Sequence, residues 1–132
     1  MKSYVLDTHG LFWHLTKNKR LGAKALAAIK QAEAGLATLF IPAVVLAELF
    51  YLNRKQGDII NFSEKFSVLQ ATSHFQLMPL EPEDILDLGL PRFAAITEMH
   101  DRLIAAAAYH LGAELFRRDE NITESKAIPV IW

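Results

Sequence analysis

The chain has 132 residues, and 52% of them are hydrophobic. This length and composition predict a single globular domain over residues 1–132, with a substantial core, and they argue against disorder. The formal net charge is −1, so no bulk positive charge indicates a nucleic-acid partner. Because cysteine is absent, disulfides and thiolate metal sites are excluded.

Neither a signal peptide nor a membrane-spanning segment is predicted from the sequence. Its longest nearly uncharged run, residues 36–53, is interrupted by Pro42 and Glu48, whereas a membrane span needs about 20 mostly apolar residues. Together with the absence of cysteine, this predicts a cytoplasmic protein that does not insert into a membrane.

Short apolar runs alternate with helical stripes along the chain. β-branched and apolar residues predict strands, and apolar positions three or four apart predict helices. A small parallel sheet flanked by helices, an α/β fold, is therefore expected. The predicted strands are 2–6, 36–41 and 128–132, with 75–80 a strand or an extended connector; the predicted helices are 21–34, 43–53, 61–73 and 81–89, and 92–97 is ambiguous.

The most informative stretch lies near the C-terminus. Asp101 is predicted to open a helix whose body, residues 103–111, contains four consecutive alanines. Gly112 sits where a left-handed residue should end this helix. Residues 113–116 are too short for another helix and are predicted to form a strand, with Asp119 just past its end.

Carboxylates at strand C-termini and helix N-termini share one edge of such a sheet, which is where α/β folds bind ligands. Asp7 follows the first predicted strand; it is either a helix cap, a metal ligand or both. Asp101 and Asp119 are predicted to reach the same edge.

Glu48 lies in a predicted helix whose neighbouring positions are apolar or aromatic. A helix that is apolar on every side is expected to be buried, and a buried carboxylate needs a cation, an ion pair or a raised pKa. An arginine partner and a metal ion are both compatible with this pattern.

Four converging carboxylates would repel one another unless they bind divalent cations or hold protons. Oxygen-only ligands select hard ions, Mg²⁺ or Mn²⁺. Such a site is suited to hydrolysis of phosphodiesters, because the metal activates water and stabilises charge on the phosphate.

Other chemistries match less well. The chain has no G-x-x-x-x-G-K-[ST] and no G-x-G-x-x-G, so nucleotide-binding loops are not indicated. A haloacid-dehalogenase-like phosphatase would need a second aspartate where His9 stands. The five histidines form no H-E-x-x-H pattern and are interpreted as surface or core residues.

The order L-D-T-H (6–9), A-E-L (47–49), H-D-R-L-I-A-A-A-A (100–108), R-D-E (118–120) and I-P-V-I-W (128–132) resembles a PIN domain, and more narrowly the VapC-type ribonuclease toxins of bacterial toxin–antitoxin pairs. The resemblance covers essentially the whole chain. It implies a three-layer α/β/α fold, cleavage of single-stranded or structured RNA, homodimers, and inhibition by a small cognate antitoxin. By position it assigns the acidic cluster that binds Mg²⁺ or Mn²⁺ to Asp7, Glu48, Asp101 and Asp119.

Two positions depart from the family pattern. The D-P-F-D-R that often precedes the central helix reads E-M-H-D-R here, with Glu98 as the first acid. Arg117 stands where the family commonly has Thr or Ser, which removes a hydroxyl that would contact water or metal. Arg117 is predicted either to contact an RNA phosphate or to pair with Glu48.

Two hypotheses about function follow. The first is a metal-dependent endoribonuclease toxin, in which Arg102, Arg117, Arg118 and the connector 17–20 are candidate RNA contacts or ordinary surface charges. The second is a non-catalytic PIN-like module that binds RNA or a protein. For either, aromatic residues expected near helix surfaces predict an apolar interface with a second copy or an antitoxin; these residues are Phe12, Trp13, Phe50 and Tyr51.

Overall fold

The structure is a computed structural model that describes residues 1–117 and 128–132. Its centre is a sheet of five parallel strands in the order β3-β2-β1-β4-β5. The strands are β1 (Lys2–Leu6), β2 (Ala37–Pro42), β3 (Phe75–Met78), β4 (Glu114–Phe116) and β5 (Val130–Ile131). The predicted edge position of the last strand is confirmed.

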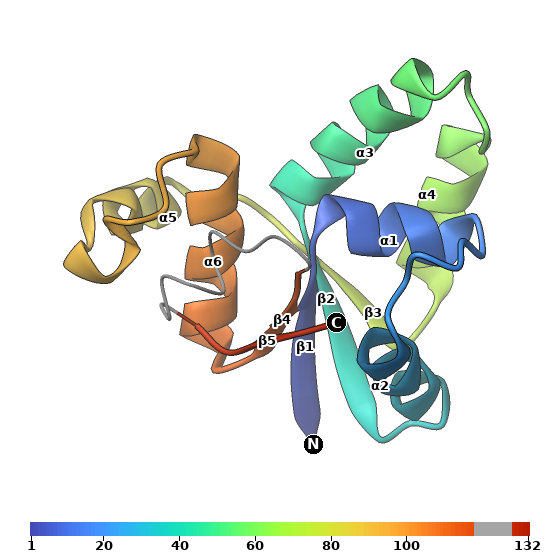
Figure 1. Cartoon of the computed structure of the whole chain (residues 1–132), viewed down its shortest axis with the longest axis horizontal. Helices are drawn as coiled ribbons and strands as arrows, with labels where there is room; N and C mark the ends of the chain where they lie inside the picture. Colours follow the sequence, from blue (N-terminus) through green and yellow to red (C-terminus); the bar gives the residue numbers. More distant parts are fainter. Residues whose placement is uncertain (118–127) are drawn as a thin grey trace.

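Helices flank this sheet on both sides, with α6 on one side and α1 and α2 on the other (Figure 1). The predicted α/β fold, with a small central parallel sheet between helices, is confirmed. The helices are α1 (Thr8–Leu15), α2 (Ala23–Glu33), α3 (Ala43–Lys55), α4 (Phe62–Ala71), α5 (Pro82–Leu86) and α6 (Met99–Leu111), with 3₁₀ turns η1 (Asp87–Gly89) and η2 (Pro91–Phe93).

The inner strands are apolar because helices cover both faces of a parallel sheet. Val5 and Leu6 of β1, Leu39 of β2 and Leu115 of β4 are all fully buried. This packing fixes the strand register, since a shift of one residue would turn each side chain to the opposite face. The C-terminal ends of β1 and β4 are therefore held side by side, with Leu6 paired to Phe116.

Helix α6 ends as predicted but begins earlier than predicted. Gly112 adopts the left-handed conformation at the C-terminal end, with φ 61°. At the other end the cap is Glu98, whose carboxylate accepts a hydrogen bond from the Asp101 backbone N–H at 2.8 Å. Asp101 thus lies inside the first turn, and its predicted role as the opening residue is wrong. Glutamate is not a favoured cap residue, so cap preferences could not have predicted Glu98 at this position.

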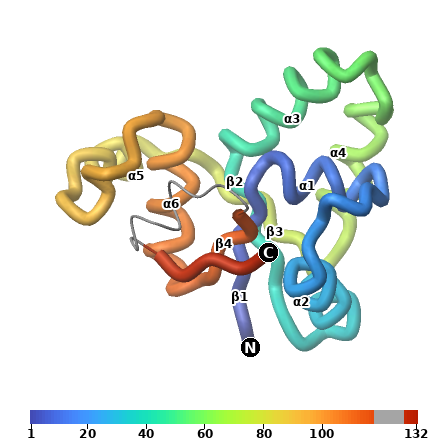
Figure 2. The backbone as a smooth tube through the Cα atoms, in the orientation of Figure 1, coloured from blue at the N-terminus to red at the C-terminus, as the bar shows by residue number. Residues whose placement is uncertain are grey.

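Helices α3 and α4 project from the sheet as a hairpin (Figure 2). The prediction that α3 is buried on every side is wrong, because Tyr51 is 73% exposed and Phe50 38% exposed. The prediction that Phe12 and Trp13 lie near the surface is also wrong. Both are buried, and the Trp13 ring packs edge-on against Trp132 with centroids 5.4 Å apart.

Across residues 1–117 and 128–132, no helix has both the length and the apolar character needed to cross a lipid bilayer.

The α3–α4 hairpin is held by a buried amide. Asn53 is only 2% exposed, and its side chain both donates to the carbonyl of Ile60 at 2.9 Å and accepts from the Ile60 backbone N–H at 3.0 Å. The substitution Asn53→Ala would leave both buried backbone groups without these bonds, so we expect a loss of about 2–3 kcal/mol in the free energy of unfolding. Urea denaturation measures this loss.

The exposed Lys55→Ala, on the same helical turn, is the control and should stay within about 0.5 kcal/mol of wild type. Equal midpoints for the two variants would contradict the role assigned to Asn53.

Candidate functional site

The site begins where the two central strands end. Because Leu6 pairs with Phe116, the next residue on each strand, Asp7 and Arg117, emerges at the same level of the C-terminal edge. The Arg117 guanidinium lies 3.6 Å from Oδ2 of Asp7 and 2.9 Å from Oδ1 of Asp101. All three side chains are largely buried, with exposed fractions of 5%, 11% and 17% for Asp7, Arg117 and Asp101. One guanidinium therefore joins two carboxylates that come from different elements.

Asp7 also caps α1. Its Oδ1 accepts a hydrogen bond from the Gly10 backbone N–H at 2.8 Å, so the predicted cap is confirmed. Burial raises the pKa of this carboxyl from 3.8 to about 7, although Gly10 and Arg117 both act to lower it, while Asp101 raises it further. The ionised form is therefore costly here and favours any nearby positive charge.

Asp101 reaches the edge from the first turn of α6, where a negative charge is favoured by the helix dipole. The neighbouring cap, Glu98, is half-exposed. Burial would raise its pKa, but hydrogen bonds from the backbone N–H groups of Asp101 and His100 outweigh this and hold the pKa below its usual value. His100 and Arg117 lower it further through their charge.

Glu48 is brought to the same region from α3. Its Oε1 accepts a hydrogen bond from the Thr8 hydroxyl at 2.7 Å, and its Oε2 lies 3.4 Å from Nδ1 of His100. The Glu48 side chain is 32% exposed, so the expectation of a buried carboxylate is wrong. The reason is that only one side of α3 packs on the core: Val45 and Leu49 are buried, whereas Tyr51 is largely exposed.

Sequence reasoning missed Thr8 and His100. Thr8 is 8% exposed and ties the start of α1 to α3, while His100 lies between Glu48 and Glu98, at 3.4 and 3.0 Å. Their position in the sequence could have identified them, since each is the immediate neighbour of a predicted acidic ligand. A polar residue beside a ligand at a crowded edge is a good candidate to orient it.

The remaining predicted residues have different outcomes. Asp119 and Arg118 lie outside the described residues. Arg102 donates from its guanidinium to the backbone carbonyls of Ile96, Leu88 and Ala94, so it anchors the 88–96 segment against α6. We therefore assign it a structural role. Arg117 was predicted to contact an RNA phosphate or to pair with Glu48; the structure places its guanidinium against Asp7 and Asp101.

A divalent cation suits the donor set. Asp7, Glu48 and Asp101 offer only oxygen, which matches hard ions such as Mg²⁺ and Mn²⁺, and the raised pKa of Asp7 marks a buried carboxyl that lacks full compensation. Among the described residues, however, no three acidic or histidine side chains are already arranged to hold a metal ion. The positive charge between Asp7 and Asp101 is instead that of Arg117.

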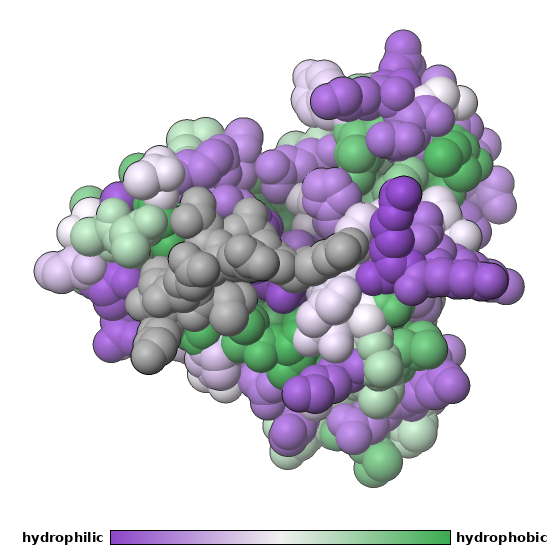
Figure 3. Space-filling view, in the orientation of Figure 1, coloured by the Kyte–Doolittle hydropathy of each residue, from purple (hydrophilic) through white to green (hydrophobic). Residues whose placement is uncertain are grey.

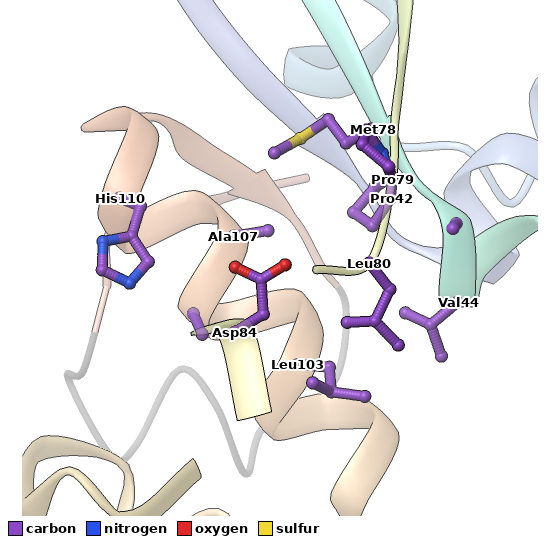
Figure 4. A pocket seen from close by; sticks show the side chains of 11 residues that line it. Pro42, Val44, Met78, Pro79, Leu80, Asp84, Leu103, Ala107 and His110 are labelled. Carbon is purple, nitrogen blue, oxygen red and sulfur yellow. The ribbon is translucent and has the colours of Figure 1, made fainter. Parts of the chain in front are cut away.

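The surface is indented between the part built from α5 and α6 and the part built from α3 and α4 (Figure 3). The elements that carry Asp7, Glu48 and Asp101 border this indentation (Figure 1). A separate cavity of about 90 Å³ lies between the start of α3, the 78–80 segment and α6 (Figure 4). It is mainly apolar, and none of the three carboxylates lines it, so we do not regard it as the site.

The chain belongs to the PIN domain family, whose profile matches residues 4–127. Solved structures with the same fold include VapBC2 from Rickettsia felis bound to a DNA fragment from its promoter, with 19% identity, a TM-score of 0.71 and coverage of 98% of this chain and 97% of that one. VapBC-1 from nontypeable Haemophilus influenzae has 19% identity, a TM-score of 0.58 and coverage of 98% and 96%. PAE2754 from Pyrobaculum aerophilum has 16% identity, a TM-score of 0.60 and coverage of 98% and 83%. A comparison with curated protein sequences gives no match.

Gly10 tests how tightly the Asp7 carboxylate is held. A Cβ added at Gly10 would lie 2.6 Å from Oδ1 of Asp7 and 3.5 Å from Cβ of Phe116, so Gly10→Ala must displace the buried carboxylate from its cap. Alanine gains up to about 1 kcal/mol of helix propensity, but the lost cap and the crowding together cost more. We expect a net destabilisation of about 1–2 kcal/mol by thermal or urea unfolding.

Gly89→Ala is the matched control, because nothing lies within 4 Å of its added Cβ. It should be neutral or slightly stabilising. A Gly10→Ala protein as stable as the Gly89→Ala protein would show that the carboxylate is free to move.

Proposed function

We propose that this PIN domain is an endoribonuclease that depends on Mg²⁺ or Mn²⁺ and acts as the toxin of a toxin–antitoxin pair. Members of the family are generally nucleases. The observation that carries the proposal is the convergence of the buried Asp7 carboxylate and Asp101 on one edge of the sheet, with Glu48 held nearby. Asp119, on the segment after β4, completes the proposed metal-binding set.

The chain's own residues fix the geometry that such a reaction needs. Asp7 is held by the Gly10 N–H, and Glu48 is held by the Thr8 hydroxyl, so neither carboxylate has to be ordered when substrate arrives. A bound cation would supply Lewis acidity towards the phosphate. Glu48 is the most exposed of the three described acids, and we assign it the proton released by the attacking water.

An RNA substrate is supported by the surface beside His9. A hollow of about 210 Å³ extends from His9 past Trp13 to Arg20. The His9 and Trp13 rings are 5.4 Å apart, and the Arg20 guanidinium lies 6.0 Å from the Trp13 ring. The His9 ring and the Arg20 guanidinium are exposed and both contact the buried Trp13 ring, so they are suited to stack on unpaired bases and to contact phosphates, and the exposed Lys17 and Lys19 extend the positive charge. This substrate implies a cytoplasmic location.

The alternative, a PIN-like module that binds without cleaving, is favoured by one observation. The Arg117 guanidinium already bridges Asp7 and Asp101, so these carboxylates are paired in the absence of a cation. Calorimetric titration with Mn²⁺ separates the two proposals. A nuclease should bind Mn²⁺ and lose this binding in Asp7→Asn, whereas a module that only binds RNA or protein should show no such Asp7-dependent binding.

The catalytic assignment predicts the behaviour of Asp7→Asn. The amide keeps the shape of the carboxyl but loses its charge, so RNA cleavage with Mg²⁺ or Mn²⁺ should fall by about 100-fold or more. The fold should persist, since burial already disfavours the charged form of Asp7. Cleavage of a labelled RNA and circular dichroism measure the two effects.

Asp58→Asn, at an exposed position with no assigned role, is the control and should cleave at the wild-type rate. Full activity in Asp7→Asn would refute the assignment of the site.

We further propose a homodimer and an antitoxin partner. VapBC complexes share the fold, which supports a protein partner. Large apolar side chains remain exposed on two regions of the chain, as an interface requires; they are Phe50, Tyr51, Ile59 and Val68 around α3 and α4, and Leu80, Ile85, Leu86 and Met99 around α5.

Light scattering should therefore give twice the chain mass of 14.8 kDa. The substitutions Tyr51→Lys and Leu86→Lys, made separately, should identify the dimer surface, because a charge buried in the contact shifts the protein towards monomer. A monodisperse wild-type monomer would contradict the dimer.

A further inference from the structure

Arg117 contacts the carboxylates that would have to supply the negative charge of a cation-binding site. It is the first residue after β4, and its guanidinium contacts carboxylate oxygens of both Asp7 and Asp101. Its side chain is 11% exposed, so solvent screens these contacts only weakly. Arg117 therefore contacts two carboxylates from different elements rather than a single acid.

The same oxygens cannot serve arginine and a metal ion equally well. A divalent cation held by Asp7 and Asp101 would bind the same carboxylates that the guanidinium now contacts, and would therefore lie close to it. Like charges this close together in a partly buried site repel strongly. The planar fork of arginine also suits two carboxylate partners, so the existing arrangement is itself favourable.

We propose that Arg117 is a built-in counter-ion that competes with the divalent cation for Asp7 and Asp101. The guanidinium stabilises the metal-free protein, and metal uptake requires it to move away from these carboxylates. Arg117 thereby lowers the affinity of the site for metal and sets the cation concentration at which the site is loaded. This inference rests on the proposed metal-dependent function.

Calorimetry with Mn²⁺ alone, at one pH and one salt concentration, tests the competition. Arg117→Gln removes the charge while keeping a polar side chain, so its affinity for Mn²⁺ should rise about tenfold or more. Arg117→Lys keeps the charge and should bind close to the wild-type protein. Arg54→Gln makes the same change in net charge at an exposed position on α3 and should leave the affinity unchanged.

Thermal unfolding gives a second measure that does not depend on activity. In the presence of a chelator, Arg117→Gln should unfold at a lower temperature than wild type, because Asp7 and Asp101 then lack their counter-ion. Saturating Mn²⁺ should raise the unfolding temperature of Arg117→Gln more than that of wild type. The opposite order of the two metal-induced increases would overturn the proposal.

The wild-type protein provides a test that needs no folded glutamine variant. The Arg117 Nε–H signal in a ¹H–¹⁵N spectrum, assigned by its loss in Arg117→Lys, should shift as Mg²⁺ is added. An unmoved signal at a Mg²⁺ concentration that saturates the site would overturn the proposal.

The outcomes also separate this inference from the proposed function. If Mn²⁺ binds in a manner lost in Asp7→Asn, but Arg117→Gln binds within twofold of wild type, the counter-ion role fails and the metal site stands. If no variant binds Mn²⁺, the metal-dependent function fails, and the competition fails with it.

Discussion

A carboxyl group buried at the C-terminal end of β1 constrains everything built around it. Asp7 is almost fully enclosed, and its charged form is tolerated only because the Gly10 N–H and the Arg117 guanidinium are directed at it. The Gly10 contact requires a helix to start at this point and its third residue to lack a Cβ. The Arg117 contact requires β4 to end beside β1. The site thus depends on the ends of β1 and β4 lying side by side and on α1 starting directly after β1.

The architecture could be predicted because it depends on local patterns that the chain displays clearly. Alternating apolar runs and helical stripes located four of the strands and most of the helices, left β3 open between a strand and an extended connector, and Gly112 marked the end of α6. Since parallel strands finish at one edge, the same patterns placed Asp7 and Asp101 at that edge. Their junction with Arg117 agrees with that placement.

The wrong predictions concern properties that the spacing of apolar residues along the chain does not determine. Glu48 has apolar neighbours on its helix, but whether such neighbours face core or solvent depends on what packs against α3, and Tyr51 is largely exposed. Trp13 was misjudged for the converse reason, since Trp132, more than a hundred residues away in sequence, covers it. Arg117 was predicted to contact an RNA phosphate or Glu48; its contacts with Asp7 and Asp101 were not predicted, because they depend on the register of β1 and β4.

That register has an evolutionary consequence. Insertion or deletion of a single residue within β4 would reverse which way every following side chain points, so Arg117 would leave Asp7 even if no amino acid were replaced. Homologous chains should therefore tolerate length changes in the 79–97 segment, which lies outside the sheet, far better than in β4. In an alignment of such chains, gaps should therefore fall outside β4. The residues at positions 7 and 117 should also vary together from one chain to the next.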